Sequence, residues 1–152
     1  MAMENIVILP FRQATNSLAS GSDTESRMGR ELVTTDRIAP PVGPFSPAVR
    51  AGGVLYLSGQ VAQVPGAGRL IEGDVTAQTE QIFANLGAVL EAAGKTFADV
   101  AKVGVFLTDM SHFQLMNAVY GRYFQAPYPA RTTVAVAGLP LGADVEIDMI
   151  VL

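Results

Sequence analysis

Several residue types that would allow particular kinds of chemistry are scarce or missing in this chain of 152 residues. It has no cysteine, which excludes disulfide bonds, thiolate catalysis and cysteine-based zinc sites. Its one histidine, His112, cannot build a histidine-rich metal site, and the sequence shows no cluster of carboxylates that would replace one. We therefore expect a protein that works without a bound metal ion.

Basic residues are also few. Lys and Arg number 10 against 14 Asp and Glu, the net charge is −4, and no run of basic residues occurs. Because nucleic-acid binding depends on clustered Lys and Arg, we do not expect a nucleic-acid surface. No apolar stretch approaches the roughly 18 residues of a membrane span, and the apolar residues 6–9 are too few for the core of a signal peptide. The expectation is a soluble, cytoplasmic protein.

The composition is that of one globular domain preceded by a different segment. Hydrophobic residues make up 49% of the chain and charged residues 16%, which is enough apolar material for a real core. Beyond Pro10, however, residues 11–27 are mainly polar. Residues 1–27 are therefore predicted to be an N-terminal extension or linker, and residues 28–152 the domain. The alternative is that residues 4–11 add an edge strand to the sheet.

Two segments carry the three- and four-residue apolar spacing of amphipathic helices. The first follows Asp74, which can cap its start, and stops before Gly94, a residue suited to the left-handed position after a helix. The second is expected to begin at Asp109 or Ser111, either of which can cap it, and to continue to about Phe124.

Strands are predicted on both sides of these helices. Residues 48–50 and 54–58 flank Gly52-Gly53 and indicate a hairpin, while residues 61–72 indicate a loop with short strands on either side. Three later strands are expected at residues 100–107, 131–136 and 144–152. The order of elements predicts a single α+β domain in which both helices pack on one face of a mixed sheet.

The last predicted strand has no plainly polar face. Its two faces consist of Val145, Ile147, Met149 and Val151 on one side and Glu146, Asp148, Ile150 and Leu152 on the other. A sheet with apolar residues on both faces usually packs against something on both. We therefore expect another copy of the chain to cover the face that the helices leave open.

Two charged residues stand out in these apolar strands. Arg131 opens a strand, and its forked guanidinium could bind the carboxylate of a small ligand or pair internally with an acid such as Glu146. Glu146, between Val145 and Ile147, is either a functional acid or a solvent-facing residue on a half-exposed strand. A simple hairpin would set Arg131 and Glu146 roughly 13 Å apart. Either another strand or a cleft is therefore expected between them.

Five short motifs share a specific spacing between about residue 38 and the C-terminus. They are Gly43-Pro44-Phe45-Ser46-Pro47-Ala48, Leu57-Ser58-Gly59-Gln60, Asn117-Ala118-Val119-Tyr120, Pro129-Ala130-Arg131-Thr132-Thr133-Val134 and Val145-Glu146-Ile147. Together they resemble the RidA/YjgF family of reactive intermediate deaminases. This resemblance implies a chorismate-mutase-like α+β fold, a homotrimer with sites at the subunit interfaces, and no cofactor.

The resemblance also implies an activity, namely hydrolytic deamination of enamine and imine acids of the 2-aminoacrylate type to 2-oxo acids and ammonia. Arg131 would hold the substrate carboxylate, and Glu146 would hold or activate the attacking water. The other residues of the implied site are Phe45, Ser58, Gly59, Asn117, Tyr120 and Thr133. Known members have tyrosine in place of Phe45 and often cysteine in place of Thr133, so the substrate range stays open.

Two other functions are compatible with the same sequence. One is a deaminase specialised for a 2-aminomuconate-like acid. The other is a non-enzymatic trimer that binds small carboxylates or contacts other proteins. Ammonia release from a freshly generated imine would separate an enzyme from a binding protein.

Overall fold

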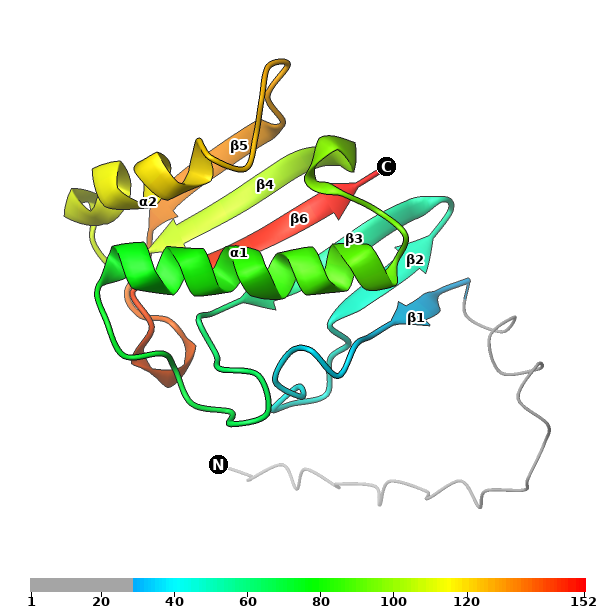
Figure 1. Ribbon diagram of the computed structural model, residues 1–152, viewed down its shortest axis with the longest axis horizontal. Coiled ribbons are helices and arrows are strands. Elements are labelled where there is room, and N and C mark those ends of the chain that lie inside the picture. Colours follow the sequence, from blue (N-terminus) through cyan, green and yellow to red (C-terminus); the bar gives the residue numbers. More distant parts are fainter. Residues whose placement is uncertain (1–28) are drawn as a thin grey trace, which may run out of the picture.

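The computed structural model describes residues 29–152, which form one six-stranded sheet with two helices (Figure 1). The strands are β1 (Glu31–Val33), β2 (Ala48–Ala51), β3 (Val54–Gln60), β4 (Val100–Leu107), β5 (Ala130–Ala135) and β6 (Val145–Val151). The helices are α1 (Val75–Ala92) and α2 (Phe113–Tyr120), and short 3-10 turns lie at Phe97–Asp99, Met110–His112 and Pro140–Gly142. The predicted extension at residues 1–27, and the alternative strand at residues 4–11, fall outside the described residues.

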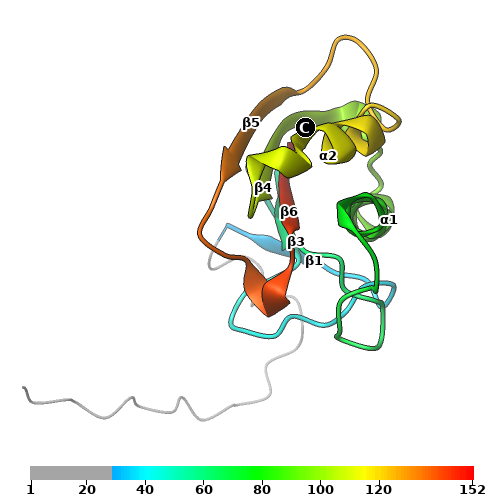
Figure 2. The ribbon, with the colours of Figure 1, turned by 90° about the vertical axis from the view of Figure 1, so that its left-hand side faces the viewer.

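The sheet is mixed, in the order β1-β2-β3-β6-β4-β5. Only β4 and β5 run parallel, and every other neighbouring pair is antiparallel. Figure 2 shows both helices on the same face of the sheet. The predicted α+β arrangement is therefore confirmed. Neither helix in residues 29–152 is long and apolar enough to cross a bilayer.

The predicted hairpin is β2–β3, joined by Gly52 and Gly53. Both glycines have positive φ, 57° and 81°, as the favoured two-residue hairpin turn requires. Residues 61–72 form the predicted loop, with β3 ending at Gln60 on one side. The short strand expected on the other side is absent, and the loop carries only an isolated bridge between Gln63 and Leu70. The remaining strand before α1 is instead β1, upstream of the hairpin and paired with β2.

The boundaries of α1 are those predicted from its capping residues. The Asp74 side chain accepts a hydrogen bond of 3.0 Å from the Ala77 backbone N–H at the start of the helix. At the other end Gly94 has φ 70°, and the following Lys95 N–H donates back to the Leu90 carbonyl. Local sequence signals are therefore enough to define this helix.

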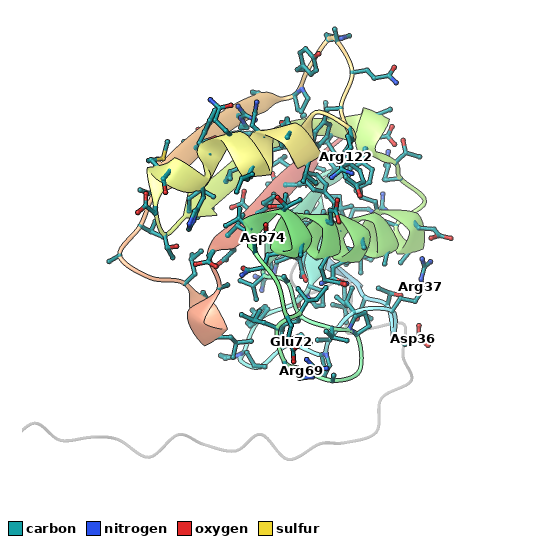
Figure 3. The ribbon with its side chains drawn as sticks, turned by 60° about the vertical axis from the view of Figure 1, so that its left-hand side comes forward. Asp36, Arg37, Arg69, Glu72, Asp74 and Arg122 are labelled. Carbon is teal, nitrogen blue, oxygen red and sulfur yellow. The ribbon has the colours of Figure 1, made fainter. Side chains whose placement is uncertain are left out.

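Ion pairs tie α1 to neighbouring segments at the surface. Arg37 pairs with Glu91 near the C-terminal end of α1, and Arg122 pairs with Glu80 nearer its start. Figure 3 shows Asp74 at the start of α1 and Arg37 near the opposite end. All four paired side chains are well exposed, so each pair contributes at most about 1 kcal/mol to stability.

The second helix is shorter than predicted at both ends. Asp109 caps the preceding 3-10 turn, accepting a 2.8 Å bond from the Ser111 N–H, so α2 itself begins only at Phe113. It ends at Tyr120 and not near Phe124. After Tyr120 the chain tightens into i→i+3 hydrogen bonds, and Tyr123 stacks on Phe83 of α1 with ring centroids 4.3 Å apart. Aromatic packing between segments thus outweighs the local helical pattern.

The core lies between the helices and one face of the sheet. On β6, Val145, Ile147, Met149 and Val151 are buried against the helices, while Glu146, Asp148 and Ile150 are only partly buried on the opposite face. That opposite face also carries Tyr56, which is 44% exposed, and no element of residues 29–152 covers it. The alternation predicted for the last strand is confirmed, and an open, partly apolar face remains.

Candidate active site

Arg131 and Glu146 are separated by a strand, as the sequence allowed. In the sheet order β4 lies between β5 and β6. Arg131 stands opposite Val103 in one ladder, and Glu146 stands opposite Phe106 in the other. Because neighbouring residues of a strand point to opposite faces, Arg131 lies on the helix face and Glu146 on the open face. An internal Arg131–Glu146 pair is therefore excluded, and one chain alone cannot direct both groups at one small ligand.

The Arg131 side chain is held against α2. One of its N–H groups donates a 2.8 Å hydrogen bond to the Asn117 side-chain oxygen. The guanidinium carbon lies 4.5 Å from the centre of the Tyr120 ring and 5.6 Å from that of Phe113, both within cation–π range. A guanidinium has five N–H donors in a rigid fork. The arrangement thus orients the fork while leaving donors for a carboxylate.

Arg131 opens into a cavity of about 370 Å³. The strand that carries this residue, β5, forms one edge of the sheet (Figure 1). The residues that line the cavity are Asn117, Tyr120, Gly121, Tyr128, Pro129 and Arg131. Burial raises the pKa of the Tyr120 hydroxyl, and the positive charge of Arg131 only partly opposes this rise. Tyr120 is therefore neutral at physiological pH and contributes its ring, not a charge, to this cavity.

Three buried polar atoms on α2, its N-cap and β5 find no hydrogen-bond partner among residues 29–152: His112 Nδ1, the Tyr120 hydroxyl and Thr133 Oγ1. Thr133 shares a face of β5 with Arg131 but lines neither cavity described here. His112 stands at the N-cap of α2 and is partly exposed, but its side chain makes no capping hydrogen bond. Orphaned buried polar atoms are rare in folded proteins and cluster where a ligand, water or partner completes the structure.

The Glu146 side chain packs against Gly59 of the neighbouring strand β3, a position without a side chain. The ladder between β3 and β6 shifts by one residue between Leu57 and Gln60, so β3 bulges at Ser58 and Gly59. A methyl group on Gly59 would come within 2.8 Å of the Glu146 carboxyl carbon and would overlap one of its oxygens. Glycine at position 59 is therefore the only residue that leaves the carboxylate where it is.

Glu146, Ser58, Gly59 and Phe45 line a second cavity, of about 330 Å³. Ser58 joins this cavity to the loop before β2, because its hydroxyl donates a 2.6 Å bond to the Ser46 carbonyl oxygen. The rest of the lining is Ile38, Ala39, Pro40, Pro41, Val42, Pro47, Gln60, Val61, Gln63, Pro140 and Leu141. A single carboxylate thus faces a mainly apolar space.

The environment of Glu146 favours its protonated form. Burial raises the pKa of the carboxyl group, and the like charge of Asp148 on the same face raises it further. Asp148 is itself held in place by a 3.0 Å hydrogen bond from the Gly104 N–H. A carboxylate with a raised pKa is better able to exchange protons near neutral pH than an ordinary surface glutamate.

The predicted site residues therefore form two groups. Phe45, Ser58, Gly59 and Glu146 surround one cavity, whereas Asn117, Tyr120 and Arg131 surround the other. Sequence reasoning missed Leu141, which lines the Glu146 cavity. Its turn is visible in the sequence as a Pro-Leu-Gly triplet, but nothing there places that turn beside Glu146.

Comparison with known proteins identifies the family. The profile of the family described as Endoribonuclease L-PSP matches residues 35–152, most of the chain, and the protein belongs to this family. Reactive Intermediate Deaminase A, chloroplastic, of Arabidopsis thaliana is 38% identical over 142 residues, covering 92% of this chain and 76% of the relative. The 2-iminobutanoate/2-iminopropanoate deaminase of Bos taurus is 39% identical over 125 residues, covering 82% and 91%. These relatives confirm the resemblance to RidA/YjgF deaminases.

Solved structures agree with this assignment. RidA from the Antarctic bacterium Psychrobacter sp. PAMC 21119 superposes with a TM-score of 0.76 at 44% identity, covering 80% of this chain and 98% of that one. E. coli TdcF with bound serine superposes with a TM-score of 0.75 at 34% identity, with the same coverage. The fold is thus shared across nearly the whole length of these proteins.

Proposed function

We propose that this protein hydrolyses reactive enamine and imine acids to 2-oxo acids and ammonia. Relatives named as deaminases of this kind support the proposal. The observation that carries it is the Glu146 carboxylate, seated over Gly59 at a cavity with its pKa raised. The net charge of −4 does not favour an RNA substrate. The cytoplasmic location expected from the sequence stays a prediction.

The reaction needs little more than positioning and proton transfer. Arg131 binds the substrate carboxylate through its forked donors and so fixes the C=N bond. Glu146 takes a proton from a water molecule as its oxygen attacks the carbon of the protonated imine (C=NH2+), which yields a neutral carbinolamine. Glu146 then returns the proton to nitrogen, the C–N bond breaks, ammonia leaves, and the hydroxyl loses its proton to become the carbonyl of the 2-oxo acid. Ser58 holds the loop before β2 through its hydrogen bond to the Ser46 carbonyl, and Asn117 orients Arg131 through its side-chain oxygen.

The site has to be shared between copies of the chain, because Arg131 and Glu146 lie on opposite faces of one sheet. We propose a chorismate-mutase-like homotrimer in which the β5 edge of one copy brings Arg131 to the Glu146 cavity of the next. The open sheet face and the orphaned polar atoms near β5 support such an interface.

The assembly can be tested with matched substitutions. Light scattering at micromolar concentration should give three times the chain mass of 16.0 kDa. Tyr56→Glu, which places a charge on the open face, should yield monomers, whereas Ala84→Glu on the exposed side of α1 should leave the trimer intact. A monomeric wild-type protein would overturn both the assembly and the shared site.

Gly59 offers a test of the Glu146 cavity that leaves every charge in place. Gly59→Ala should displace the Glu146 carboxylate and lower kcat/KM by about tenfold or more, since small misplacements of a catalytic group are costly. Gly138→Ala is the control, because a methyl group there meets nothing within 4 Å. Steady-state kinetics with circular dichroism would check this, and full activity of folded Gly59→Ala protein would contradict the assigned position of Glu146.

The proposed reaction itself is tested by generating imines in situ with an amino-acid oxidase and measuring the rate at which they are hydrolysed. The protein should accelerate formation of the 2-oxo acid and ammonia in proportion to its concentration. Binding of 2-oxo acids without any such acceleration would instead indicate the non-enzymatic binding protein.

A further inference from the structure

Helix α1 carries three buried polar side chains on the face that packs against the sheet. Gln78, Thr79 and Asn85 are 5%, 0% and 2% exposed, and no other polar side chain in residues 29–152 is buried to this extent. Thr79 satisfies its hydroxyl within the helix, by donating a 2.6 Å hydrogen bond to the Val75 carbonyl. The amides of Gln78 and Asn85 instead reach out of the helix to two different segments.

Gln78 is paired with Asp144, the residue directly before β6. Its amide N–H donates a 2.9 Å hydrogen bond to one Asp144 carboxylate oxygen, and its amide oxygen accepts another of 2.9 Å from the Asp144 backbone N–H. The other carboxylate oxygen accepts a 3.3 Å bond from the hydroxyl of Thr108, just beyond β4, and the Thr108 backbone N–H donates to the Asp144 carbonyl at 3.1 Å. Asp144 is therefore fixed both from α1 and from the end of β4, and Glu146 follows it two positions later.

Asn85 holds the loop that follows β3. Its side-chain N–H donates a 3.0 Å hydrogen bond to the Gln63 carbonyl, while its side-chain oxygen accepts a 2.9 Å bond from Gln81 of the same helix. The Gln63 side chain in turn donates to the Gly68 carbonyl at 2.9 Å across the loop. The loop is thus attached to α1 at a residue that borders the Glu146 cavity.

The segments that these two amides hold both line the Glu146 cavity, although α1 itself contributes no residue to the lining. The loop after β3 contributes Val61 and Gln63, and the turn before Asp144 contributes Pro140 and Leu141 (Figure 1). Buried amides cost free energy to desolvate, and apolar side chains would pack α1 against the sheet without that cost. What the amides add is a fixed position for two segments, which a satisfied hydrogen-bond network specifies more sharply than apolar packing does.

We propose that Gln78 and Asn85 are positioning residues for imine hydrolysis. Gln78 sets the start of β6, and with it the place of the Glu146 carboxylate, while Asn85 holds another part of the wall of the same cavity. This inference rests on the proposed deaminase function and extends it to two residues that touch no reacting atom. Because Arg131 is held separately, by Asn117 on α2, the loss of these amides should lower kcat more than it weakens binding of a carboxylate.

The first experiment removes the amides from the full-length protein and follows hydrolysis of imines generated in situ by an amino-acid oxidase. Gln78→Met deletes both bonds to Asp144 at similar side-chain volume, and kcat should fall about tenfold while calorimetric affinity for a 2-oxo acid changes by less than about threefold. Asn85→Leu should change both quantities in the same directions. Thr79→Val is the matched control, because it deletes a buried hydrogen bond of the same helix that reaches no loop, and it should lower the melting temperature but leave kcat unchanged.

A second experiment exchanges the amide and the carboxylate of the Gln78–Asp144 pair. Gln78→Glu alone sets two carboxylates against each other and should lower kcat about tenfold or more, because the start of β6 is displaced. Asp144→Asn in the same chain restores one amide and one carboxylate in reversed order. The double variant should therefore return to within about threefold of the wild-type kcat.

Circular dichroism identifies the preparations that are folded at the assay temperature. If the wild type hydrolyses imines and folded Gln78→Met protein keeps the wild-type kcat, or loses only affinity for the 2-oxo acid, the positioning role is wrong and the deaminase function stands. The role is equally wrong if Asp144→Asn does not recover the kcat lost in Gln78→Glu. If the wild type hydrolyses no imine, the proposed function fails and the positioning role fails with it.

Discussion

Replacing Arg131 with alanine is expected to lower kcat/KM by about 10²- to 10³-fold, because it removes a charge-assisted anchor for the substrate carboxylate. Binding of 2-oxo acids should weaken in parallel, since the anchor acts on the ground state as well as the transition state. Arg131→Lys should recover little of this loss. A point charge cannot reproduce the planar fork, and lysine stacks less well on the ring that lies 4.5 Å from the guanidinium.

A second arginine in the chain provides the control. Arg122 pairs with Glu80 at the surface, and Arg122→Ala should change kcat/KM little. Calorimetric titration of a 2-oxo acid and imine kinetics on the same preparations measure both effects. An Arg131→Ala protein that binds the acid as tightly as wild type would rule out the anchor role.

Replacing Glu146 with glutamine is expected to lower turnover by about 10²-fold or more while 2-oxo acid binding persists. Glutamine keeps the shape of the side chain over Gly59 but cannot accept the proton from water. The variant should also be at least as stable as wild type at neutral pH. The raised pKa of Glu146 means that its ionised form destabilises the fold, so the gain should vanish as the pH falls below the ordinary glutamate pKa.

The pH profile supplies the control for this role. If Glu146 acts as the base, wild-type kcat/KM should fall as the pH drops through its raised pKa. Asp148→Asn removes the like charge that contributes to the rise, so the acid limb should move to lower pH while maximal activity is kept. An acid limb that stays in place in Asp148→Asn, or a Glu146→Gln enzyme with wild-type turnover, would show that another group is the base.

Where the sequence predicted the fold correctly, the determining interactions are local. The α1 helix has a capping aspartate, a terminal glycine and a continuous apolar stripe, all within about 20 residues. The turn of the β2–β3 hairpin is predicted directly by the pair Gly52-Gly53, both of which have positive φ. Such elements hardly depend on the rest of the chain, so their boundaries could be predicted from the local sequence alone.

The predictions from sequence were wrong or incomplete where contacts between distant segments determine the local structure. The end of α2 is set by Tyr123 stacking on Phe83, a contact across 40 positions that no periodicity reports. The three-residue strand β1 exists because β2 offers an edge to pair with, and its own sequence carries no alternating pattern long enough to detect.

The same division applies to the site. Arg131 and Glu146 stood out as charges in apolar strands, and the roles assigned to both came from the family resemblance. Their separation by a strand arises because β4 lies between β5 and β6 in the sheet. This strand order depends on contacts along the whole domain and not on the local sequence around either residue. Leu141 could not be found beforehand, because only the folded structure places its turn beside the Glu146 cavity.

The most direct test of the shared site is complementation between two inactive variants. Arg131→Ala and Glu146→Gln proteins are mixed, dissociated and reassembled, with mixed trimers verified by native mass spectrometry. A site that takes Arg131 from one copy and Glu146 from the next is intact in about one quarter of random pairings, so the mixture should regain about that fraction of wild-type imine hydrolysis. Activity that stays at the level of the two parents, in preparations shown to contain mixed trimers, would contradict the shared site.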